Sequence, residues 1–330
     1  MNAGVFIEIT GTSFAMNIVY ATDENGVIGV GVSIVSLMEN LASSVHADIY
    51  ILANGLTNHS ITRLQSLEQK YDLQLHLIDV GDRFQDFPVG PNWSAATYYR
   101  LGLSSFLPST VDRVLYVDID VIFNRDAFAM YQTEMGDALI AGVFTTEHLS
   151  SDTFRRWEKE MELPHDSIYI NAGVILYNLS KIREEHFEKH VLEYAVQHIS
   201  SLTWQDQDII NKCYQERILL LHPMWNICEP AIWQIRWNGV KKFTNNPLQE
   251  EELLEAVKHP GIIHYWGVPK PWHPDSIRHD YGLFNKYWKI STFSDKIKEK
   301  KMNSNNFRML SSYFKCTCGK AIRLMKRQHR

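Results

Sequence analysis

Two aspartates, Asp118 and Asp120, stand one residue apart directly after the apolar run at residues 114–117. Alternate residues of a strand point to the same face, so both carboxylates can reach one cation. Open α/β sheets bind ligands beyond the carboxyl ends of their strands, and Mg²⁺ or Mn²⁺ prefers such hard oxygen ligands. The pair therefore indicates a divalent metal that bridges a diphosphate. Two solvated acids in a turn are the plain alternative.

A second set of residues suited to this chemistry lies later in the chain, from His264 to Trp272. His264 follows a short apolar run and can serve as a third metal ligand. Gly267 lets the backbone approach a phosphate closely, and Lys270 supplies a point charge for phosphate oxygens. An aromatic, proline-rich surface loop is the alternative for this segment.

Three further polar side chains could contact a sugar. Asp206 and Gln207 stand at the start of a predicted helix, where an acid also serves as a simple cap. Asn171 lies inside the apolar run at residues 169–174. A buried asparagine needs hydrogen-bonding partners, and either a bound sugar or a neighbouring loop would supply them.

The elements that must position these residues alternate between strand and helix up to residue 120. The pattern predicts strands at 17–21, 48–52, 73–80 and 113–117, and helices at 27–41, 58–70 and 95–106. Such alternation favours a mostly parallel sheet with helices on both faces. The two aspartates would then follow the fourth strand, at the ligand-binding edge of the sheet.

The pattern changes after residue 120. We expect strands at 138–144, 167–177 and 262–265, helices at 153–162, 182–199 and 206–215, and a loop-rich stretch at 223–249. The predicted fold class is therefore α/β, with a mixed, mostly parallel sheet flanked by helices.

Composition and charge suggest how the chain is divided. Its 330 residues, 45% of them hydrophobic, fit one large globular domain with a smaller appendage. The net charge of −5 hides a basic end, because residues 296–330 hold eleven Lys or Arg and one acid, Glu299. We expect an extension at 1–15 with Met16 as the natural start, a domain at 16–283, and a basic, amphipathic helical tail at 284–330. A tail of this kind would bind an anionic membrane surface through residues 296–330.

The expected location is the cytoplasm, peripherally on the inner face of the plasma membrane. No apolar run approaches the roughly 20 residues that span a bilayer. The first 15 residues contain no Lys or Arg, so a signal peptide is not expected. Cys316 and Cys318 are too closely spaced for a zinc pair, and a reduced protein is the plain interpretation of the four cysteines. Nucleic acid is not an expected partner.

Taken together, these motifs resemble glycosyltransferase family 8. Its motifs occur here in the family's order: the opening strand with 21–25, the acidic pair, the segment 171–174, and 206–208 before the motif at 264–272. The match covers about residues 16–275. It implies a GT-A fold, which is that of nucleotide-diphospho-sugar transferases, and a retaining transfer. Within the family, the chain is similar to bacterial enzymes that extend lipopolysaccharide, lipooligosaccharide or other surface glycans.

The resemblance also implies which residues bind the donor. The residues at matching positions are Ala21, Asp23, Asn25, Arg100, Asp118, Ile119, Asp120, Asn171, Asp206, Gln207, Gly267 and Lys270. The first three would meet the uridine and ribose of a UDP-sugar. Arg100 would pair with donor phosphate or sugar, and Gly267 and Lys270 would bind the diphosphate.

Further roles implied by the resemblance concern the metal and the transferred sugar. Asp118, Asp120 and His264 would hold Mn²⁺ or Mg²⁺. Asn171 would help to hold the sugar, while Asp206 and Gln207 would be catalytic, with Gln207 near the anomeric carbon. Because Gln207 is a poor nucleophile, we expect front-face attack through an ion-pair-like state.

The substrates implied by the resemblance are UDP-glucose or UDP-galactose as donor and a glycan or glycolipid as acceptor. Several relatives carry an acid in the loop where the acceptor binds, and here residues 145–147 read Thr-Thr-Glu. A histidine common before the segment of Arg100 is absent, with residues 91–93 in its place. Both departures leave the acceptor open and the donor chemistry largely intact.

Three other functions fit parts of the sequence. Residues 118–121 resemble the nucleophile loop of a haloacid-dehalogenase-like phosphohydrolase, although that loop belongs on an early strand. Residues 26–31 suggest a dinucleotide-binding dehydrogenase, but the glycine order is wrong. A non-catalytic sugar-binding module would not need metal ligands and phosphate-binding cations together.

Overall fold

The chain is described by a computed structural model over residues 14–90, 93–145, 158–159, 161–163, 167–240, 247–267, 269–273, 276 and 282–296. The predicted helix at 153–162, most of the loop 145–147, and the tail beyond residue 296 lie largely or wholly outside these residues. None of the described helices has the length and hydrophobicity that spanning a lipid bilayer requires.

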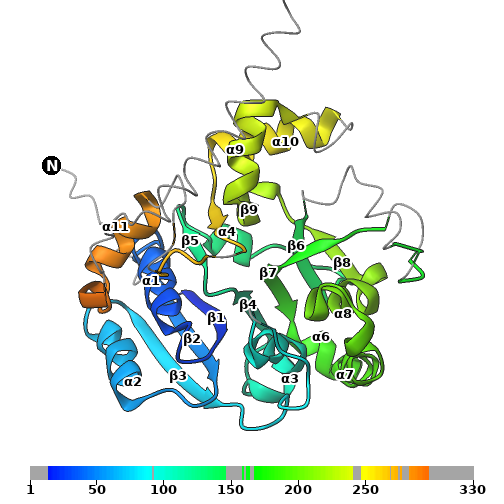
Figure 1. Cartoon of the computed structure of the whole chain (residues 1–330), viewed down its shortest axis with the longest axis horizontal. Helices are drawn as coiled ribbons and strands as arrows, with labels where there is room; N and C mark the ends of the chain where they lie inside the picture. The colour runs from blue at the N-terminus through cyan, green and yellow to red at the C-terminus, as the bar shows by residue number, and fades with distance from the viewer. Residues whose placement is uncertain are drawn as a thin grey trace, which may run out of the picture.

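A seven-stranded sheet forms the centre of the molecule (Figure 1). In spatial order its strands are β3 (Leu73–Asp79), β2 (Val45–Ala53), β1 (Phe14–Thr22), β4 (Arg113–Val117), β7 (Ile170–Asn178), β6 (Ile140–Phe144) and β8 (Ile218–Leu220). Strand β7 runs antiparallel to both of its neighbours, and the other four strand pairs are parallel. The predicted α/β class with a mixed, mostly parallel sheet is confirmed.

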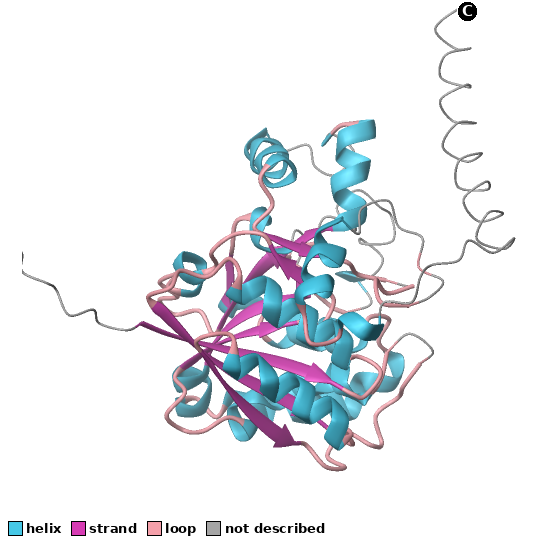
Figure 2. Cartoon of the chain, turned by 90° about the vertical axis from the view of Figure 1, so that its left-hand side faces the viewer, coloured by secondary structure: helices cyan, strands magenta, loops and turns pink. Residues whose placement is uncertain are grey.

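Helices cover both faces of this twisted sheet (Figure 2). Alternate strand residues enter two cores: Ile18 and Leu115 pack on one face, and Val19 and Val114 on the other. The first face is covered by α1 (Val27–Met38), α2 (Asn58–Gln65), η1 (Ser66–Gln69) and α11 (Gly282–Ile290). The second is covered by η2 (Ala95–Gly102), α3 (Leu103–Phe106), α6 (Leu179–Glu184), α7 (Phe187–His198) and α8 (Gln205–Cys213).

A second, three-stranded sheet adjoins the first core. It consists of β5 (Val121–Phe123), β10 (Ile262–His264) and β9 (Ile227–Cys228), with β10 in the middle. The short helix α4 (Phe128–Tyr131) follows β5, and the one-turn helices η3 (Ile199–Ser201), η4 (Gln215–Arg217) and η5 (Pro223–Asn226) lie in connections. A further one-turn helix, η7 (Ser294–Lys296), follows α11. Helices α9 (Glu229–Asn238) and α10 (Pro247–Lys258) stand beyond the small sheet, at the top of Figure 1.

Two expectations about the later elements are wrong. The stretch 223–249 is not mainly loop, because α9 occupies ten of its residues and begins with a proline in its first turn, where a missing N–H costs little. The helix expected at 182–199 is broken between α6 and α7, since His186 takes a left-handed φ of 51°. Apolar spacing that continues across this break concealed it.

The expected division at residue 283 also differs from the structure. Helix α11 packs against α1, and its Phe284, Tyr287 and Trp288 are buried in the first core. The described residues up to 296 therefore belong to the body, and a separate tail would begin later. At the other end, β1 begins at Phe14, two residues before the expected start of the domain.

Candidate active site

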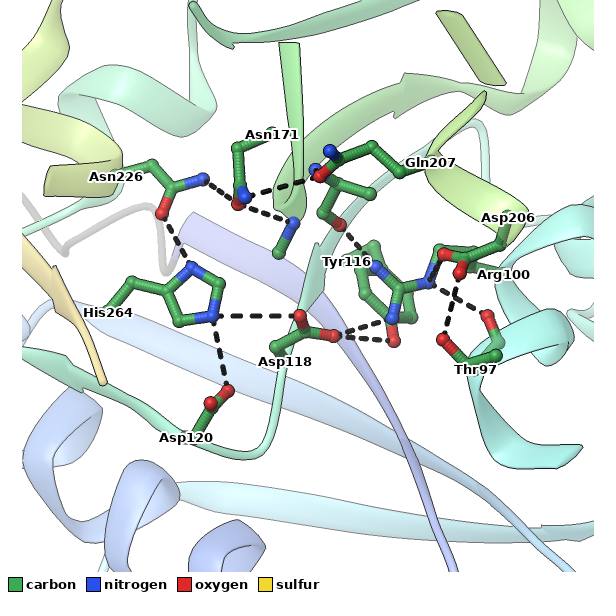
Figure 3. A network of polar contacts seen from close by, with 12 residues as sticks. Thr97, Arg100, Tyr116, Asp118, Asp120, Asn171, Asp206, Gln207, Asn226 and His264 are labelled. Atoms are coloured by element: carbon green, nitrogen blue, oxygen red, sulfur yellow. Dashed lines mark hydrogen bonds and ion pairs between the residues drawn. The ribbon is translucent and has the colours of Figure 1, made fainter. Parts of the chain in front are cut away.

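The acidic pair lies in the turn between β4 and β5. Strand β4 ends at Val117, and the Asp118 N–H then donates to the Gly173 carbonyl oxygen of β7 (N···O 2.8 Å). Asp120 is 2% exposed, whereas Asp118 is half-buried. The expectation that the pair follows strand alternation is wrong, because the chain turns at these residues. The turn nevertheless brings both carboxylates to His264 (Figure 3).

His264, the last residue of β10, completes a group of three potential metal ligands. Its Nε2 lies 3.7 Å from Asp118 Oδ2 and 3.3 Å from Asp120 Oδ1. One ligand atom from each residue lies within 4.8 Å of the other two. Strand β10 reaches this place because it pairs antiparallel with β5, which directly follows the acidic turn. The structure thus brings together the three residues predicted to hold a metal.

The convergence of these ligands depends on Gly173. A Cβ atom at this position would lie 2.2 Å from His264 Cε1 and 2.9 Å from Asp118 Oδ2, which is closer than side-chain carbons approach such atoms. Only glycine leaves room for both side chains. Two carboxylate oxygens and one imidazole nitrogen suit a small divalent cation, so the donor set fits the expected type of metal without selecting Mn²⁺ over Mg²⁺.

Lys270 forms an ion pair with the buried acid: its Nζ contacts Asp120 Oδ2. Burial acts to raise the pKa of Asp120, but the adjacent Lys270 ammonium outweighs it and holds that pKa below its ordinary value. Asp120 is therefore a carboxylate, as a metal ligand must be. Gly267, three residues before Lys270, has a φ of 79°, a conformation that favours glycine.

Arg100 is buried between two carboxylates. Its guanidinium nitrogens lie 2.7 Å from Asp118 Oδ1 and 3.0 Å from Asp206 Oδ2. A third nitrogen donates to the Ala172 carbonyl oxygen at 2.5 Å, and the group stacks over the Tyr116 ring at 4.3 Å. Arg100 thus holds the Asp118 carboxylate, and with it the acidic turn, in place. A contact with donor phosphate or sugar remains a prediction.

Asp206 shares this arginine with Asp118. Burial raises the pKa of Asp206 to about 6, although Arg100 acts in the opposite direction. The physical reason is that one guanidinium faces two carboxylates away from water. The other oxygen of Asp206 accepts a hydrogen bond from Thr97 Oγ1 at 2.9 Å, so both oxygens are engaged by the protein.

Asn171 and Gln207 form a second cluster beside the acidic turn (Figure 3). Gln207 Oε1 accepts hydrogen bonds from Asn171 Nδ2 (3.2 Å) and from the Ala172 N–H (3.0 Å). Gln207 Nε2 donates to Tyr169 Oη at 3.0 Å. Asn171 was expected to need partners, and neighbouring elements supply them.

A pocket of about 430 Å³ opens at the carboxyl ends of β1 and β4. Eight of the predicted donor-binding residues line it: Ala21, Asp23, Asn25, Arg100, Asp118, Ile119, Asp120 and Lys270. The Asp23 carboxylate accepts hydrogen bonds from the Asn25 and Gly26 N–H groups, which shapes the turn after β1. This volume is typical of a small-molecule site.

The remaining predicted residues are not part of the pocket lining. Asn171, Asp206, Gln207 and His264 adjoin it through the contacts described above, and Gly267 lies in the turn after β10. Thr145, the described residue of the expected acceptor loop, is buried, and its N–H donates to the Tyr169 carbonyl oxygen.

Sequence reasoning missed two residues of this network. Asn226 hydrogen-bonds both His264 and Asn171, and the buried Tyr169 bridges Gln207 to Asp208. Asn226 lies in the stretch 223–249, which the sequence predicts to be loop-rich. Its one signal was a polar residue directly before the apolar pair Ile227–Cys228, which is too common to be informative.

Comparison with known proteins places this site in a family. The model of the family described as Glycosyl transferase family 8 matches residues 17–276. The chain belongs to this family. The family 8 assignment confirms the resemblance and shows that the protein is an enzyme, a glycosyltransferase. The phosphohydrolase, the dehydrogenase and the non-catalytic sugar-binding module are therefore excluded as its primary function.

Among curated relatives of this family 8 protein is the lipopolysaccharide 1,2-glucosyltransferase of Escherichia coli K12. It is 28% identical over 281 residues, which cover 85% of this chain and 78% of the relative. The lipopolysaccharide 1,3-galactosyltransferase of Salmonella typhimurium LT2 is 26% identical over 265 residues, which cover 78% of this chain and 73% of the relative.

A solved structure supports the fold. The galactosyltransferase LgtC, in complex with donor and acceptor sugar analogs, matches with a TM-score of 0.74 at 23% identity. The match covers 86% of this chain and all of that one. The GT-A-type fold expected from the sequence is thus confirmed.

Proposed function

We propose that this protein transfers glucose or galactose from a UDP-sugar to a glycan or glycolipid acceptor, with retention of configuration, in the biosynthesis of lipopolysaccharide or another surface glycan. The names of the two curated relatives support hexosyl transfer to lipopolysaccharide. The observation that carries the proposal is the convergence of Asp118, Asp120 and His264 with Lys270 at one pocket.

The donor nucleotide would bind where the first strands end. Ala21 lines the pocket from the end of β1, Asp23 and Asn25 line it from the turn that follows, and Ile119 lines it from the acidic turn. We assign the uridine and ribose to this part, which leaves the diphosphate near Lys270 and Gly267. A nucleotide in this orientation would carry its phosphates toward the acidic pair.

Asp118, Asp120 and His264 would hold Mn²⁺ or Mg²⁺, which supplies charge that neutralises the departing diphosphate. Lys270 would add a second positive charge on the same side. Because Arg100 holds Asp118 by an ion pair, the carboxylate keeps its orientation before any ligand arrives. This preorganisation is what electrostatic stabilisation of a leaving group requires.

The retaining mechanism we propose is front-face attack. The bond between the anomeric carbon and UDP breaks, the acceptor oxygen bonds to that carbon from the same face, and the hydroxyl proton passes to the departing diphosphate. Gln207 supports this choice, since its Oε1 already accepts two hydrogen bonds and is poorly placed to act as a nucleophile. In this proposal Gln207 and Asp206 position the sugar and stabilise developing positive charge.

The expected membrane partner rests on the basic segment 296–330, which lies almost wholly outside the described residues. We propose that it holds the enzyme on an anionic membrane surface, where each base contributes about 1 kcal/mol. The test is sedimentation with anionic liposomes. Unchanged binding after deletion of residues 297–330 would argue against it.

The function itself is tested by UDP release from a panel of UDP-sugars, with Mn²⁺, with Mg²⁺ and with a chelator. We expect release from UDP-glucose or UDP-galactose that stops on chelation and returns when the metal is restored. Release that a chelator does not change would contradict the metal site. No release from any donor would contradict the choice of UDP-hexose.

A further inference from the structure

The backbone of β7 fixes the orientation of two side-chain amides in the site. The Ala172 N–H donates to Gln207 Oε1 (3.0 Å), and the Gly173 N–H donates to Asn171 Oδ1 (3.0 Å). A backbone N–H can only donate, so an amide oxygen, not an amide nitrogen, must face it. Neither amide can turn over without placing two donors against each other.

This orientation determines that of Asn226. Asn171 Oδ1 also accepts a hydrogen bond from Asn226 Nδ2 at 2.9 Å, so Asn226 must present its nitrogen there. Its oxygen then faces His264 Nδ1 at 3.0 Å. Since a carbonyl oxygen can only accept, the hydrogen of this bond belongs to Nδ1 of the imidazole.

The same chain of hydrogen bonds continues in the other direction to a buried acid. Asn171 Nδ2 donates to Gln207 Oε1, and Gln207 Nε2 donates to Tyr169 Oη. The Tyr169 hydroxyl then donates to Asp208 Oδ1 at 2.9 Å. Asp208 Oδ2 accepts from two backbone N–H groups, those of Thr203 and Trp204, which holds the end of the chain in place. Every bond between His264 and Asp208 thus runs in one direction.

We propose that Asn226 is a positioning residue that holds His264 as its Nδ1–H tautomer and so presents the Nε2 lone pair to the acidic pair. The inference deepens the proposed metal site and rests on it for its functional meaning. The buried Asn226, 4% exposed, lies between the metal-ligand group and the residues assigned to the sugar. Asn226 would therefore set the geometry of the metal-ligand group and of the residues assigned to the sugar.

The alternative tautomer shows why the residue matters. His264 Nε2 lies 3.3 Å from Asp120 Oδ1, so a hydrogen on Nε2 would be donated to that carboxylate. A cation would then compete with this hydrogen for both groups. Partners that orient a ligating histidine typically contribute about 10- to 100-fold to metal affinity.

The first experiment reads the tautomer without metal or substrate. Two-bond ¹⁵N–¹H correlations at alkaline pH distinguish the two neutral forms of His264, and the spectrum of His264→Gln assigns the signals. We expect the Nδ1–H form in the wild type and predominantly the Nε2–H form in Asn226→Leu. The Nε2–H form in the wild type, or an unchanged tautomer in Asn226→Leu, would overturn the proposal.

Asn124→Ser is the matched control. Asn124 is half-buried and donates to the Pro260 carbonyl oxygen beside β10, but it does not contact His264. We expect this variant to keep the wild-type tautomer. Loss of the Nδ1–H form in Asn124→Ser as well would show a general disturbance of β10 and would contradict a specific role for Asn226.

The second experiment uses Asn226→Asp to separate the two bonds of the residue. A carboxylate still accepts from His264 Nδ1–H but cannot donate to Asn171 Oδ1. We expect Asn226→Leu to weaken Mn²⁺ binding, measured by electron paramagnetic resonance, by about 10- to 100-fold. Asn226→Asp should restore the tautomer and the Mn²⁺ affinity while kcat for sugar transfer stays low. Equal defects in both variants would overturn the proposal.

These readouts separate the inference from the proposed function. If the wild type binds no Mn²⁺ and chelation leaves UDP release unchanged, the metal-dependent function is wrong, and the tautomer measurement still decides the role of Asn226. If the wild type binds Mn²⁺ and Asn226→Leu binds it equally well, the proposed function stands and the positioning role is wrong.

Discussion

The part of the molecule from β1 to β4 and the part from β5 to β10 hold their site residues in place by different means. Ala21, near the end of β1, and Asp118, directly after β4, lie at the carboxyl ends of two adjacent parallel strands, so one sheet edge brings them together. Asn171, Gln207 and Asn226 come from β7, α8 and η5 and meet through side-chain hydrogen bonds. The first arrangement follows from backbone pairing, whereas the second depends on individual side chains. Substitutions should therefore act differently in the two parts.

Asp120→Asn should have the largest effect, because Asp120 stands where the two parts meet. The change removes a ligand charge, leaves Lys270 without its partner carboxylate, and alters the contact with His264. We expect UDP release to fall by on the order of 10³-fold, with loss of Mn²⁺ binding. Steady-state kinetics and Mn²⁺ titration measure both. Asp86→Asn, at an exposed acid, should change neither.

Gln207→Ala should have the next largest effect, and it should be confined to the second part. The amide is held by Asn171, Ala172 and Tyr169 and does not contact the metal ligands. We expect kcat to fall by about 100-fold while Mn²⁺ affinity stays unchanged. Near-full transfer by this variant would contradict a catalytic role for Gln207. Gln205→Ala, at a half-buried residue two positions earlier, should retain most of the activity.

Asp206→Asn should change how stability depends on pH. Burial raises the pKa of Asp206 from the ordinary 3.8 to about 6. Between these two pH values the carboxyl group of Asp206 is protonated in the folded protein and ionised in the unfolded chain. The contribution of Asp206 is then full below pH 3.8 and is lost as pH rises through about 6. Two pKa units correspond to on the order of 3 kcal/mol.

Urea denaturation across this pH range measures that contribution. We expect the free energy of unfolding of Asp206→Asn to increase relative to that of the wild type as pH rises from about 4 to about 6. Asp86→Asn should parallel the wild type. The opposite trend, in which Asp206→Asn loses stability relative to the wild type as pH rises, would mean that Arg100 outweighs burial at this buried pair.

The same contrast explains how much the sequence could predict. Strand–helix alternation predicted β1 to β4 and the sheet edge that collects Ala21, Asp23 and Asp118, because backbone pairing follows apolar periodicity. The later elements were predicted less well: β5, β8 and β9 have three residues or fewer, too short for a periodic signal. Asn226 forms hydrogen bonds with Asn171, which is 55 residues away in the sequence, and with His264, which is 38 residues away. Such contacts depend on tertiary packing and leave no local pattern.

The part from β1 to β4 and the later part also differ in backbone strain. Before β5, the described residues with positive φ are the glycines Gly55 and Gly81, whereas His186, Gln205 and Glu162 adopt such angles in the later part. A side chain in the left-handed region costs about 1–2 kcal/mol. His186→Gly removes this cost at the break between α6 and α7, although the greater freedom of glycine in the unfolded chain offsets part of the gain.

We therefore expect His186→Gly to raise the free energy of unfolding by about 0.5–1 kcal/mol. Urea denaturation at constant pH measures the change, and UDP release should be unaffected because His186 lies outside the pocket lining. His186→Ala retains a Cβ atom and should give no gain, which separates relief of backbone strain from loss of the imidazole. Stabilisation by alanine equal to that by glycine would show that the imidazole itself is unfavourable there, and the later part of the chain would then be no more strained than the first.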